Sequence, residues 1–356
     1  MPKTIGNIEL YMGPQHLGAP DDLLTAIVNF IDGAQKRLYV AVQELDARPI
    51  AEAIIRARRR KVVVKLVLEA DYLVEKTLLD DPFMPGGEFE INRFLHGAIL
   101  RSHILVNSDF NPEIFHQKFM VRDGASLLTG SANFTDTDTA QNLNHLVIIH
   151  DRKVAKAYEK EFDEIQDGHF GKLDEGHDPA PDEIDVSGIR VKILFAPDHN
   201  PEMEIMKQIA KATERVDFAI FTFARSSGID DQMALAAKAG TVFRGALFRD
   251  QANQAWSAKD ILKGEPGIDM FLVPRKNLPP PRPRKLHHKL MVIDRRLVIV
   301  GSFNYTGPAN RLNDENIIIL GDLDCPDPAI IQLERELARY ALDEIDRMID
   351  RFGEKV

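Results

Sequence analysis

The chain is poor in the residues that crosslink proteins or anchor them. It has a single cysteine, Cys325, and a single tryptophan among 356 residues. One cysteine excludes an internal disulfide, and no Cys-His zinc pattern or thiol nucleophile is indicated. The sequence also lacks a basic-then-apolar leader and any apolar run of about 18 residues, the length that a membrane-spanning helix needs. We therefore expect a cytoplasmic protein without stable membrane association.

Positive charge is also scarce, since Lys and Arg number 45 against 55 Asp and Glu, a formal net charge of −10. Binding of an anion, however, depends on where cations cluster. A basic cluster at residues 56–61 is interpreted as a solvated helix end. A second cluster ends with Arg282, Arg284 and Lys285, directly before His287. These three are candidate substrate-binding residues, with a solvated surface as the alternative.

One pattern of fixed positions occurs twice at identical spacing. In each copy a Lys stands two residues after a His, an Asp stands seven after it, and Gly-Ser-x-Asn begins fourteen after it. The first copy comprises His116, Lys118, Asp123, Gly130, Ser131 and Asn133, and the second comprises His287, Lys289, Asp294, Gly301, Ser302 and Asn304. Chance does not account for two such matches.

The spacing predicts how these side chains meet. Residues two apart on a strand point to the same face, so His and Lys of each copy share a face. Apolar runs follow each Lys and precede each Gly, and the turn residues between them predict a hairpin. The hairpin brings together an imidazole, an ammonium, a hydroxyl and an amide. These groups are suited to holding and attacking a tetrahedral phosphate.

The two copies resemble the His-x-Lys-x4-Asp-x6-Gly-Ser-x-Asn signature of the phospholipase D superfamily, with both copies in one chain. The second half, from Phe248 through His287 to Asn316, most resembles its nuclease-like branch. The resemblance implies a phosphodiesterase that needs no metal or other cofactor and works through a phosphohistidine. It also implies that His116 is the nucleophile and that His287 is the general acid and base.

The remaining motif residues are expected to support these histidines. Lys118 and Lys289 would neutralise the non-bridging phosphate oxygens, and Asn133 and Asn304 would donate hydrogen bonds to them.

For the other motif positions two readings stay open. Ser131 and Ser302 either contribute to the site or only cap their turns. The resemblance suggests a supporting catalytic role for Asp123 and Asp294, which we interpret as structural.

The resemblance also implies a carboxylate that orients a catalytic imidazole, and Glu315 matches it. At the same offset the first half has Asn144, followed by His145. An amide can orient an imidazole but cannot stabilise its cation as a carboxylate does, so the halves are expected to differ in role. His288 falls between motif positions and is interpreted as a core or supporting histidine.

The elements around the motifs repeat too. Strand, helix, strand, helix and strand are expected over 8–14, 21–34, 36–42, 48–59 and 62–68, and again over 191–197, 203–213, 216–223, 230–238 and 242–248. Packing helices are expected over 154–165 and 330–352. The order predicts an α/β fold, internally duplicated with a period of about 175 residues, as two α/β sandwich halves related by a pseudo-twofold axis.

We divide the chain into a first half at 1–165, a linker at 166–188 and a second half at 189–356. The linker contains His169 and His177, whose surroundings do not indicate a metal site. Two inserts, 75–97 and 252–285, show no regular pattern and are expected to be loops that set specificity.

Several functions fit these observations. The leading hypothesis is a nuclease that cleaves DNA or RNA. The alternative is a phospholipase D or phosphatidyltransferase, which would need an apolar, membrane-facing rim. The insert at 75–97 offers apolar residues for it, broken by acids: Phe83, Met84, Phe89, Phe94 and Leu95. A third is an inactive nucleic-acid-binding scaffold. Metal-dependent hydrolysis is disfavoured because Lys is a poor metal ligand. With both half-sites in one chain, a dimer is not required to complete the site.

Overall fold

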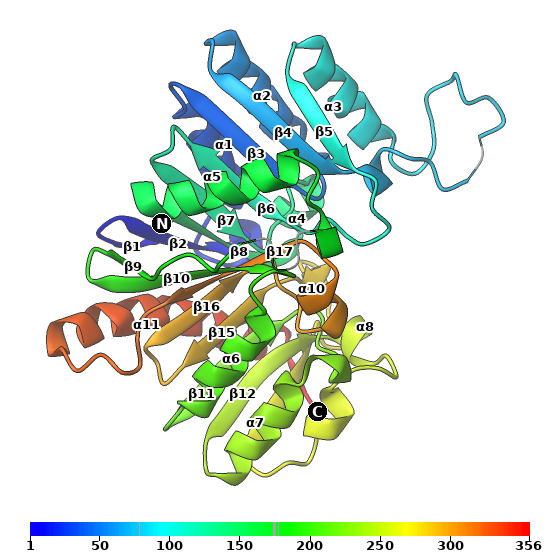
Figure 1. Ribbon diagram of the computed structural model, residues 1–356. Coiled ribbons are helices and arrows are strands. Elements are labelled where there is room, and N and C mark those ends of the chain that lie inside the picture. The colour runs from blue at the N-terminus through cyan, green and yellow to red at the C-terminus, as the bar shows by residue number, and fades with distance from the viewer. Residues whose placement is uncertain (78, 174–175, 177) are drawn as a thin grey trace.

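The computed structural model describes residues 1–77, 79–173, 176 and 178–356. Within them the strands form two mixed sheets of nine strands each, one built mainly from each half of the chain. Figure 1 shows the sheets one above the other, with α1, α2 and α3 in the upper part and α6 and α7 in the lower part. The predicted α/β class and the duplication are therefore confirmed.

The elements of the first half follow the predicted order. They are β1 Lys3–Ile5, β2 Ile8–Gly13, α1 Leu23–Asp32, β3 Arg37–Val42, α2 Arg48–Arg59, β4 Val63–Glu69, α3 Glu90–Arg101, β5 Leu105–Asp109, β6 Lys118–Arg122, β7 Ser126–Gly130, α4 Asp136–Ala140, β8 Asn142–Ile149 and α5 Arg152–Gln166.

The second half repeats this order with small additions. Its elements are β9 Ile184–Val186, β10 Ile189–Ala196, α6 Pro201–Ala210, β11 Arg215–Ile220, α7 Ile229–Lys238, β12 Val242–Phe248, α8 Arg249–Ala252, α9 Lys259–Leu262, β13 Ile268–Val273, β14 Lys285–Leu286, β15 Lys289–Ile293, β16 Leu297–Gly301, α10 Gly307–Arg311, β17 Glu315–Leu320, α11 Pro328–Phe352 and β18 Glu354–Lys355.

Strand order is the same in both sheets. The first runs β1-β2-β8-β7-β6-β3-β4-β5, and the second contains β10-β17-β16-β15-β11-β12-β13 in matching positions. In each sheet three strands joined through helices pair in parallel, β3-β4-β5 and β11-β12-β13. The strands that carry the motifs form antiparallel hairpins, β6-β7 and β15-β16. The predicted hairpins are thus present.

The two inserts are more regular than expected. The insert at 75–97 contains the start of α3, and the insert at 252–285 contains α9 and the strand β13. β13 is an apolar run that pairs in parallel with β12, so its partner lies outside the insert. β9, within the expected linker, has three residues and pairs with β10. α9 and β9, with four and three residues, are too short to show a period, so only their neighbours in the fold define them.

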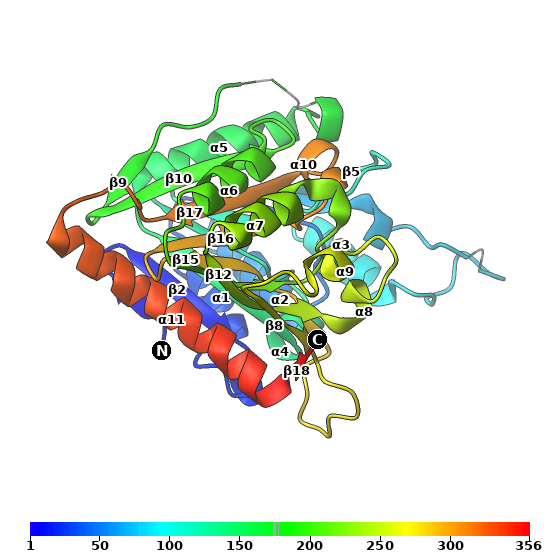
Figure 2. The ribbon, with the colours of Figure 1, turned by 90° about the horizontal axis from the view of Figure 1, so that it is seen from below.

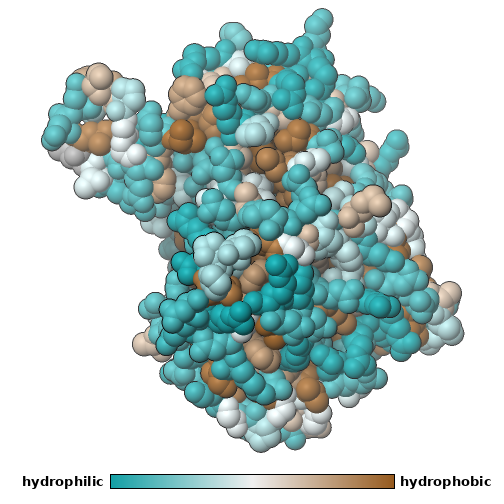
Figure 3. Space-filling view, turned by 180° about the vertical axis from the view of Figure 1, so that it is seen from behind, coloured by the Kyte–Doolittle hydropathy of each residue, from teal (hydrophilic) through white to brown (hydrophobic). Residues whose placement is uncertain are grey.

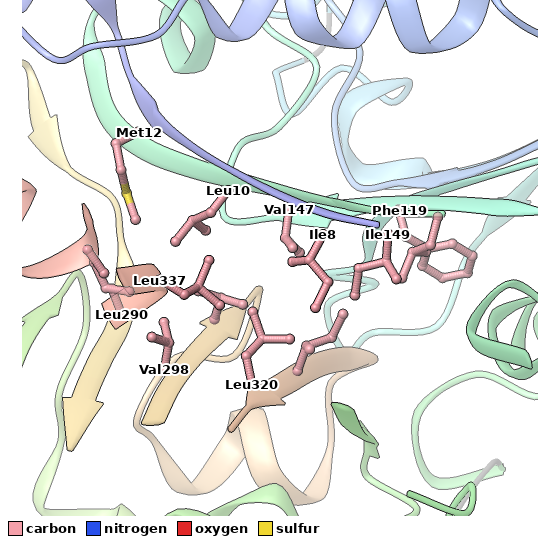
Figure 4. Packing of buried hydrophobic residues seen from close by; sticks show 14 of the residues in the cluster. Ile8, Leu10, Met12, Phe119, Val147, Ile149, Leu290, Val298, Leu320 and Leu337 are labelled. Carbon is pink, nitrogen blue, oxygen red and sulfur yellow. The ribbon is translucent and has the colours of Figure 1, made fainter. Parts of the chain in front are cut away.

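A shared core joins the two halves. Buried side chains of the first sheet, such as Leu10 and Val147, face Leu290 and Leu320 of the second across the space between the sheets (Figure 4). Leu337 of α11 joins the same cluster. Figure 2 shows α11 along one side of the molecule, and it contacts strands of both sheets. Burying each such aliphatic side chain contributes about 1.5–3 kcal/mol, so this core holds the halves in one arrangement.

Outer cores lie on the other faces of the sheets. One packs α1, α2 and α3 on the first sheet, and the other packs α6, α7 and α9 on the second. Among the described residues, every helix is too short or too polar to serve as a bilayer-crossing segment.

Candidate active site

Each catalytic hairpin is built the same way. His116 and His287 lie just before β6 and β15, and the Gly-Ser-x-Asn sequences begin at the ends of β7 and β16. The glycines are required by a close approach of backbones, because a Cβ at Gly130 would lie 2.3 Å from the carbonyl oxygen of His145. The equivalent Cβ at Gly301 would lie 2.3 Å from the carbonyl oxygen of Asn316.

The two halves exchange backbone contacts just before each histidine. The backbone N–H of His116 donates to the carbonyl of Asp314 in the second half, over 3.0 Å. The N–H of His287 donates to the carbonyl of Leu143 in the first half, over 2.9 Å, beside the pairing of β14 with β8. Each histidine is therefore carried by one half and placed against the other.

This exchange pairs His116 with Glu315. Nδ1 of His116 lies 2.7 Å from a carboxylate oxygen of Glu315, which is itself fully buried. The hydroxyl of Ser302 donates to the same carboxylate and accepts the backbone N–H of Asn316. Ser302 thus orients the group that orients His116.

His287 has the corresponding set of neighbours, drawn from the first half. Its Nδ1 lies 3.0 Å from Oδ1 of Asn144 and 3.6 Å from a carboxylate oxygen of Asp138. The hydroxyl of Ser131 donates to Oδ1 of Asn144, and the Asn144 amide donates to the backbone carbonyl of Asp138. The expected difference between the halves is present, because Nδ1 of His116 is hydrogen-bonded to a carboxylate and Nδ1 of His287 to an amide, with the carboxylate of Asp138 farther away.

The two lysines lie beside the histidines and are buried. Nζ of Lys118 donates to Oε1 of Gln43 and to the carbonyl of His116, over 3.1 and 2.7 Å. Nζ of Lys289 lies 3.2 Å from Nε2 of His287 and donates to the carbonyl of that residue. Both lysines are 1% exposed, so each ammonium is costly to bury without an anionic ligand.

Burial dominates the electrostatics of the site. It holds the pKa of His116 and His287 well below the usual value, and the nearby ammonium groups add to this effect. It also lowers the pKa of Lys118 to about 8 and raises that of Glu315 to about 8. Before substrate binds, these shifts favour the neutral imidazole in both histidines, which is the form that a nucleophile needs. An anionic phosphodiester in the cleft would raise the pKa of His287 and so favour the protonated form that a general acid needs.

A cleft of about 720 Å³ opens onto the two histidines, while Lys118, Lys289 and Glu315 are not among its lining residues. It is lined by both histidines, Asn133 and Asn304, and by Arg284 and Lys285. The carbonyl-type oxygens Oδ1 of Asn133 and Asn304 are buried and have no hydrogen-bond partner among the described residues. A ligand in the cleft is positioned to meet both side-chain amides.

Sequence reasoning missed two residues that follow β3 and β11. Gln43 and Phe221 occupy equivalent positions, since their backbone N–H groups donate to the carbonyls of Gln117 and His288. Gln43 contacts Lys118, while Nζ of Lys289 lies 5.1 Å from the centre of the Phe221 ring. The repeat itself was the available signal, because both follow the third strand of each unit directly.

The cleft also contains acidic and aromatic groups that the motif does not include. Glu44, Tyr72 and Asp138 line it together with the start of α3. Burial, followed by the charges of Asp46 and Asp138, raises the pKa of Glu44 to about 7.

Some candidates lie away from the cleft. Asp123 accepts the backbone N–H groups of residues 35–37, and Asp294 accepts those of residues 213–215. Both therefore hold the beginning of the neighbouring strand, as the structural interpretation requires, and their place among the catalytic candidates is corrected. Arg282 donates to the carbonyl of Leu278 and does not line the cleft, unlike Arg284 and Lys285.

Among the described residues, Asp178, Asp198 and His199 form the one group with the proximity of metal ligands. Lys160 forms an ion pair with Asp178 there, and the group does not line the cleft. Of the linker histidines, His177 lies outside the described residues.

Comparison with known proteins places the chain in a family. The family model of the cardiolipin synthase PLD-like domain matches residues 27–166 and 205–340. Mitochondrial cardiolipin hydrolase of Xenopus laevis is 30% identical over 148 residues, which cover 42% of this chain and 59% of that protein. Phospholipase D of Rickettsia felis is 30% identical over 132 residues, 37% of this chain and 58% of that protein. The chain thus spans under two thirds of the length of these relatives.

A solved structure extends the likeness to both halves. Phosphatidylserine synthase of Haemophilus influenzae Rd KW20 superposes with a TM-score of 0.66 at 13% identity, covering all of this chain and 88% of that one. At this identity the likeness concerns the fold. Because the family model matches on both sides of the linker and over most of the chain, the protein belongs to the phospholipase D superfamily, as a member with two PLD-like units in one chain.

Proposed function

We propose that this protein is a phosphodiesterase that cleaves phospholipid through His116 and His287 and without a metal ion. The crosswise pairing of the two histidines, each held by a residue of the other half above one cleft, carries the proposal. This replaces the nuclease as the leading hypothesis, because the family model is that of a cardiolipin synthase domain and the curated relatives described above are a cardiolipin hydrolase and a phospholipase D.

The geometry supports a two-step transfer. Since Glu315 engages Nδ1 of His116, Nε2 is the nitrogen that attacks phosphorus. The phosphorus–nitrogen bond forms as the bond to the head-group oxygen breaks, and that oxygen takes a proton from His287. In the second step His287 removes a proton from water, whose oxygen attacks phosphorus and releases His116. An alcohol in place of water gives phosphatidyl transfer by the same step.

The buried cations support the transition state. The ammonium groups of Lys118 and Lys289 would neutralise the non-bridging oxygens, and the amides of Asn133 and Asn304 would donate to them. These donors are fixed in place before substrate binds, which makes them effective in a site with little water.

A protruding segment that carries exposed apolar side chains, among three acidic ones, supports a lipid substrate. We name residues 79–89 the finger; its base is held by Arg93, which pairs with Glu75 and donates to the carbonyl of Gly86. Phe83 is 95% exposed and Met84 62% exposed. Figure 3 shows the lobe that projects beside α3, with hydrophobic residues on it. The last residues of the finger, Gly87 to Phe89, line the cleft together with Glu90 and Ile91 at the start of α3, so the finger begins at the cleft entrance.

The charge at the entrance of the cleft also favours a phospholipid over a nucleic acid as the substrate. Five acidic residues line the cleft, and two cations oppose them. The acids are Glu44, Asp46, Glu88, Glu90 and Asp138, and the cations are Arg284 and Lys285. A polyanion that extends along the rim would meet repulsion on the acidic side, whereas a single phosphodiester need only reach the buried lysines.

Nuclease activity is the second candidate. Arg284 and Lys285 lie at the cleft, and Nζ of Lys285 is 5.6 Å from the centre of the Phe221 ring. A cation beside an aromatic ring is an arrangement with which proteins bind single-stranded nucleic acid, although the Phe221 ring is partly buried against Phe248.

One assay separates the candidates. Vesicles of cardiolipin, phosphatidylglycerol or phosphatidylcholine, and labelled single-stranded DNA, duplex DNA and RNA, are incubated with the protein in excess EDTA. His116→Ala and His287→Ala are compared with His16→Ala, which removes an exposed histidine. We expect wild type and His16→Ala to release head group while both site variants are inactive. Cleavage of nucleic acid alone would replace the lipid proposal with the nuclease, and activity abolished by EDTA would contradict the metal-free mechanism.

A further inference from the structure

A second pair of histidines is buried behind the catalytic pair and plays no part in the chemistry. Nδ1 of His145 lies 3.1 Å from Nδ1 of His288, and both side chains are inaccessible to solvent. The rings are 10° from parallel with their centres 5.3 Å apart. That separation is close to the nitrogen–nitrogen distance plus the two ring radii, so the rings meet edge to edge with a hydrogen bond in their plane.

The neighbours of this pair determine where its protons lie. The backbone N–H of Gly301 donates to Nε2 of His145, so that nitrogen is unprotonated and the ring carries its proton on Nδ1. His145 then donates to Nδ1 of His288, whose proton must be on Nε2, 3.6 Å from a carboxylate oxygen of Glu344. Both imidazoles are neutral in this arrangement, and every donor in the chain points from Gly301 toward Glu344.

The pair joins parts of the two half-sites. His145 follows Asn144, which holds His287, and His288 follows His287 itself. Gly301 precedes Ser302, whose hydroxyl holds the carboxylate that orients His116. The hydrogen bonds of His145 therefore connect the segment that orients His287 to the segment that orients His116.

The duplication gives His145 and His288 each a counterpart in the other half, and these counterparts are amides in place of imidazoles. Gln117 and Asn316 stand at the equivalent places, one after His116 and fifteen after Gly301. Nδ2 of Asn316 donates to Oε1 of Gln117 over 2.7 Å, and Nε2 of Gln117 donates to Glu161 over 3.1 Å. The direction of donation, toward a carboxylate on the following helix, is the same. The amide pair cannot accept a proton in the accessible pH range, whereas the imidazole pair can.

We propose that His145 and His288 are positioning residues that hold the two half-sites in register only while both imidazoles are neutral, which makes the enzyme sensitive to acid at this position. An added proton goes either to Nε2 of His145, against the N–H of Gly301, or to Nδ1 of His288, against the N–H of His145. Each choice sets two donors face to face and breaks the chain of hydrogen bonds.

Burial opposes this protonation, while the charges around the pair act in both directions. Lys289 lies near both rings, and Arg347 on α11 neutralises Glu344 through a two-point ion pair. Glu344 acts in the other direction, since it favours a cation on His288. Burial, as the largest effect, lowers the pKa of both imidazoles. The neutral pair is thus the stable form near neutral pH.

The first test does not need a substrate, so it is independent of the proposed function. In histidine labelled with ¹⁵N, the two rings of wild-type protein at pH 7.5 are expected to be neutral, with His145 protonated on Nδ1 and His288 on Nε2. A scalar coupling between the two Nδ1 nuclei is expected across the hydrogen bond. A charged ring or the opposite tautomers would overturn the proposal.

The second test uses the amide pair as a template. The double variant His145→Asn, His288→Gln copies Asn316 and Gln117, and His16→Asn is the control for loss of a histidine. We expect the ratio of kcat at pH 8 to kcat at pH 5.5 to fall at least threefold in the double variant, with KM unchanged and the control equal to wild type. An unchanged ratio in a folded variant would contradict the proposal. If the double variant does not fold, the proposal is tested by the ¹⁵N measurement of the two tautomers in wild-type protein.

Discussion

The carboxylate of Glu315 in the second half lies 2.7 Å from Nδ1 of His116 in the first. His287 has an amide, Asn144, in the equivalent place. The two imidazoles are therefore equivalent in sequence but differ in the group bonded to Nδ1, and this difference supports the proposal that His116 carries the positive charge that develops when it attacks phosphorus.

Replacing this carboxylate tests that selection. In Glu315→Gln we expect the rate of formation of the phosphohistidine to fall on the order of 10–100-fold, because the amide still orients the ring but does not stabilise its cation. Rapid-quench measurement of the covalent intermediate gives this rate directly. Glu183→Gln, a change at an exposed surface carboxylate, is the control, and equal rates in the two variants would contradict the role of Glu315.

The motif aspartates are expected to affect stability and not chemistry. Asp294→Ala removes the acceptor for the backbone N–H groups of residues 213–215, and we expect it to lower the free energy of unfolding by about 1–3 kcal/mol. Urea denaturation measures this loss, and Asp123→Ala should behave alike. A kcat that falls as far as in His116→Ala, in protein that remains folded, would return these residues to the catalytic set.

Glu44 gives a prediction about pH. Its pKa is raised by burial to about 7, above the value of 4.5 for an unperturbed Glu, so the folded protein binds its proton more tightly than the unfolded chain. Its contribution to stability is therefore present at low pH and is lost as pH rises from about 4.5 to 7. Glu44→Gln should remain as stable as wild type at pH 5 and become more stable at pH 8, by on the order of 1 kcal/mol.

Thermal melts at the two pH values check this prediction. The difference in Tm between variant and wild type should be larger at pH 8 than at pH 5. A difference that is the same at both pH values would mean that the carboxyl of Glu44 is not held neutral by its surroundings.

The finger is expected to matter for bilayers but not for dispersed substrate. In a double variant, Phe83→Ser with Met84→Ser, we expect turnover of phospholipid vesicles to fall about tenfold, because losing two apolar side chains removes about 3 kcal/mol of burial, part of which is realised at a bilayer surface. Turnover of a short-chain phospholipid below its micelle concentration should be unchanged. Phe110→Ser, at another exposed aromatic, is the control.

Two outcomes would count against this role of the finger. Equal losses with vesicles and with monomeric lipid would indicate that Phe83 and Met84 shape the cleft. No loss with either substrate would leave the apolar tip without a function in turnover.

The short-range features of this protein follow from its sequence. Spacing of two between His and Lys, apolar runs and turn residues predict both hairpins, and their repetition predicts two equivalent α/β units. These features depend on neighbouring residues in one strand or hairpin. β9 was not predicted, because three residues show no pattern of their own. β13 has six residues, but it lies in an insert that was expected to be a loop, and its pairing with β12 is what defines it.

The assembled site depends on the tertiary structure. The sequence identifies Glu315 as a carboxylate that orients an imidazole, and the packing of the sheets determines that this imidazole is His116, 199 residues away. The same packing joins His145 of the first half to His288 of the second. Such contacts have no local signal, because they arise where two sheets bury a common apolar core and so bring distant backbone segments within hydrogen-bonding distance.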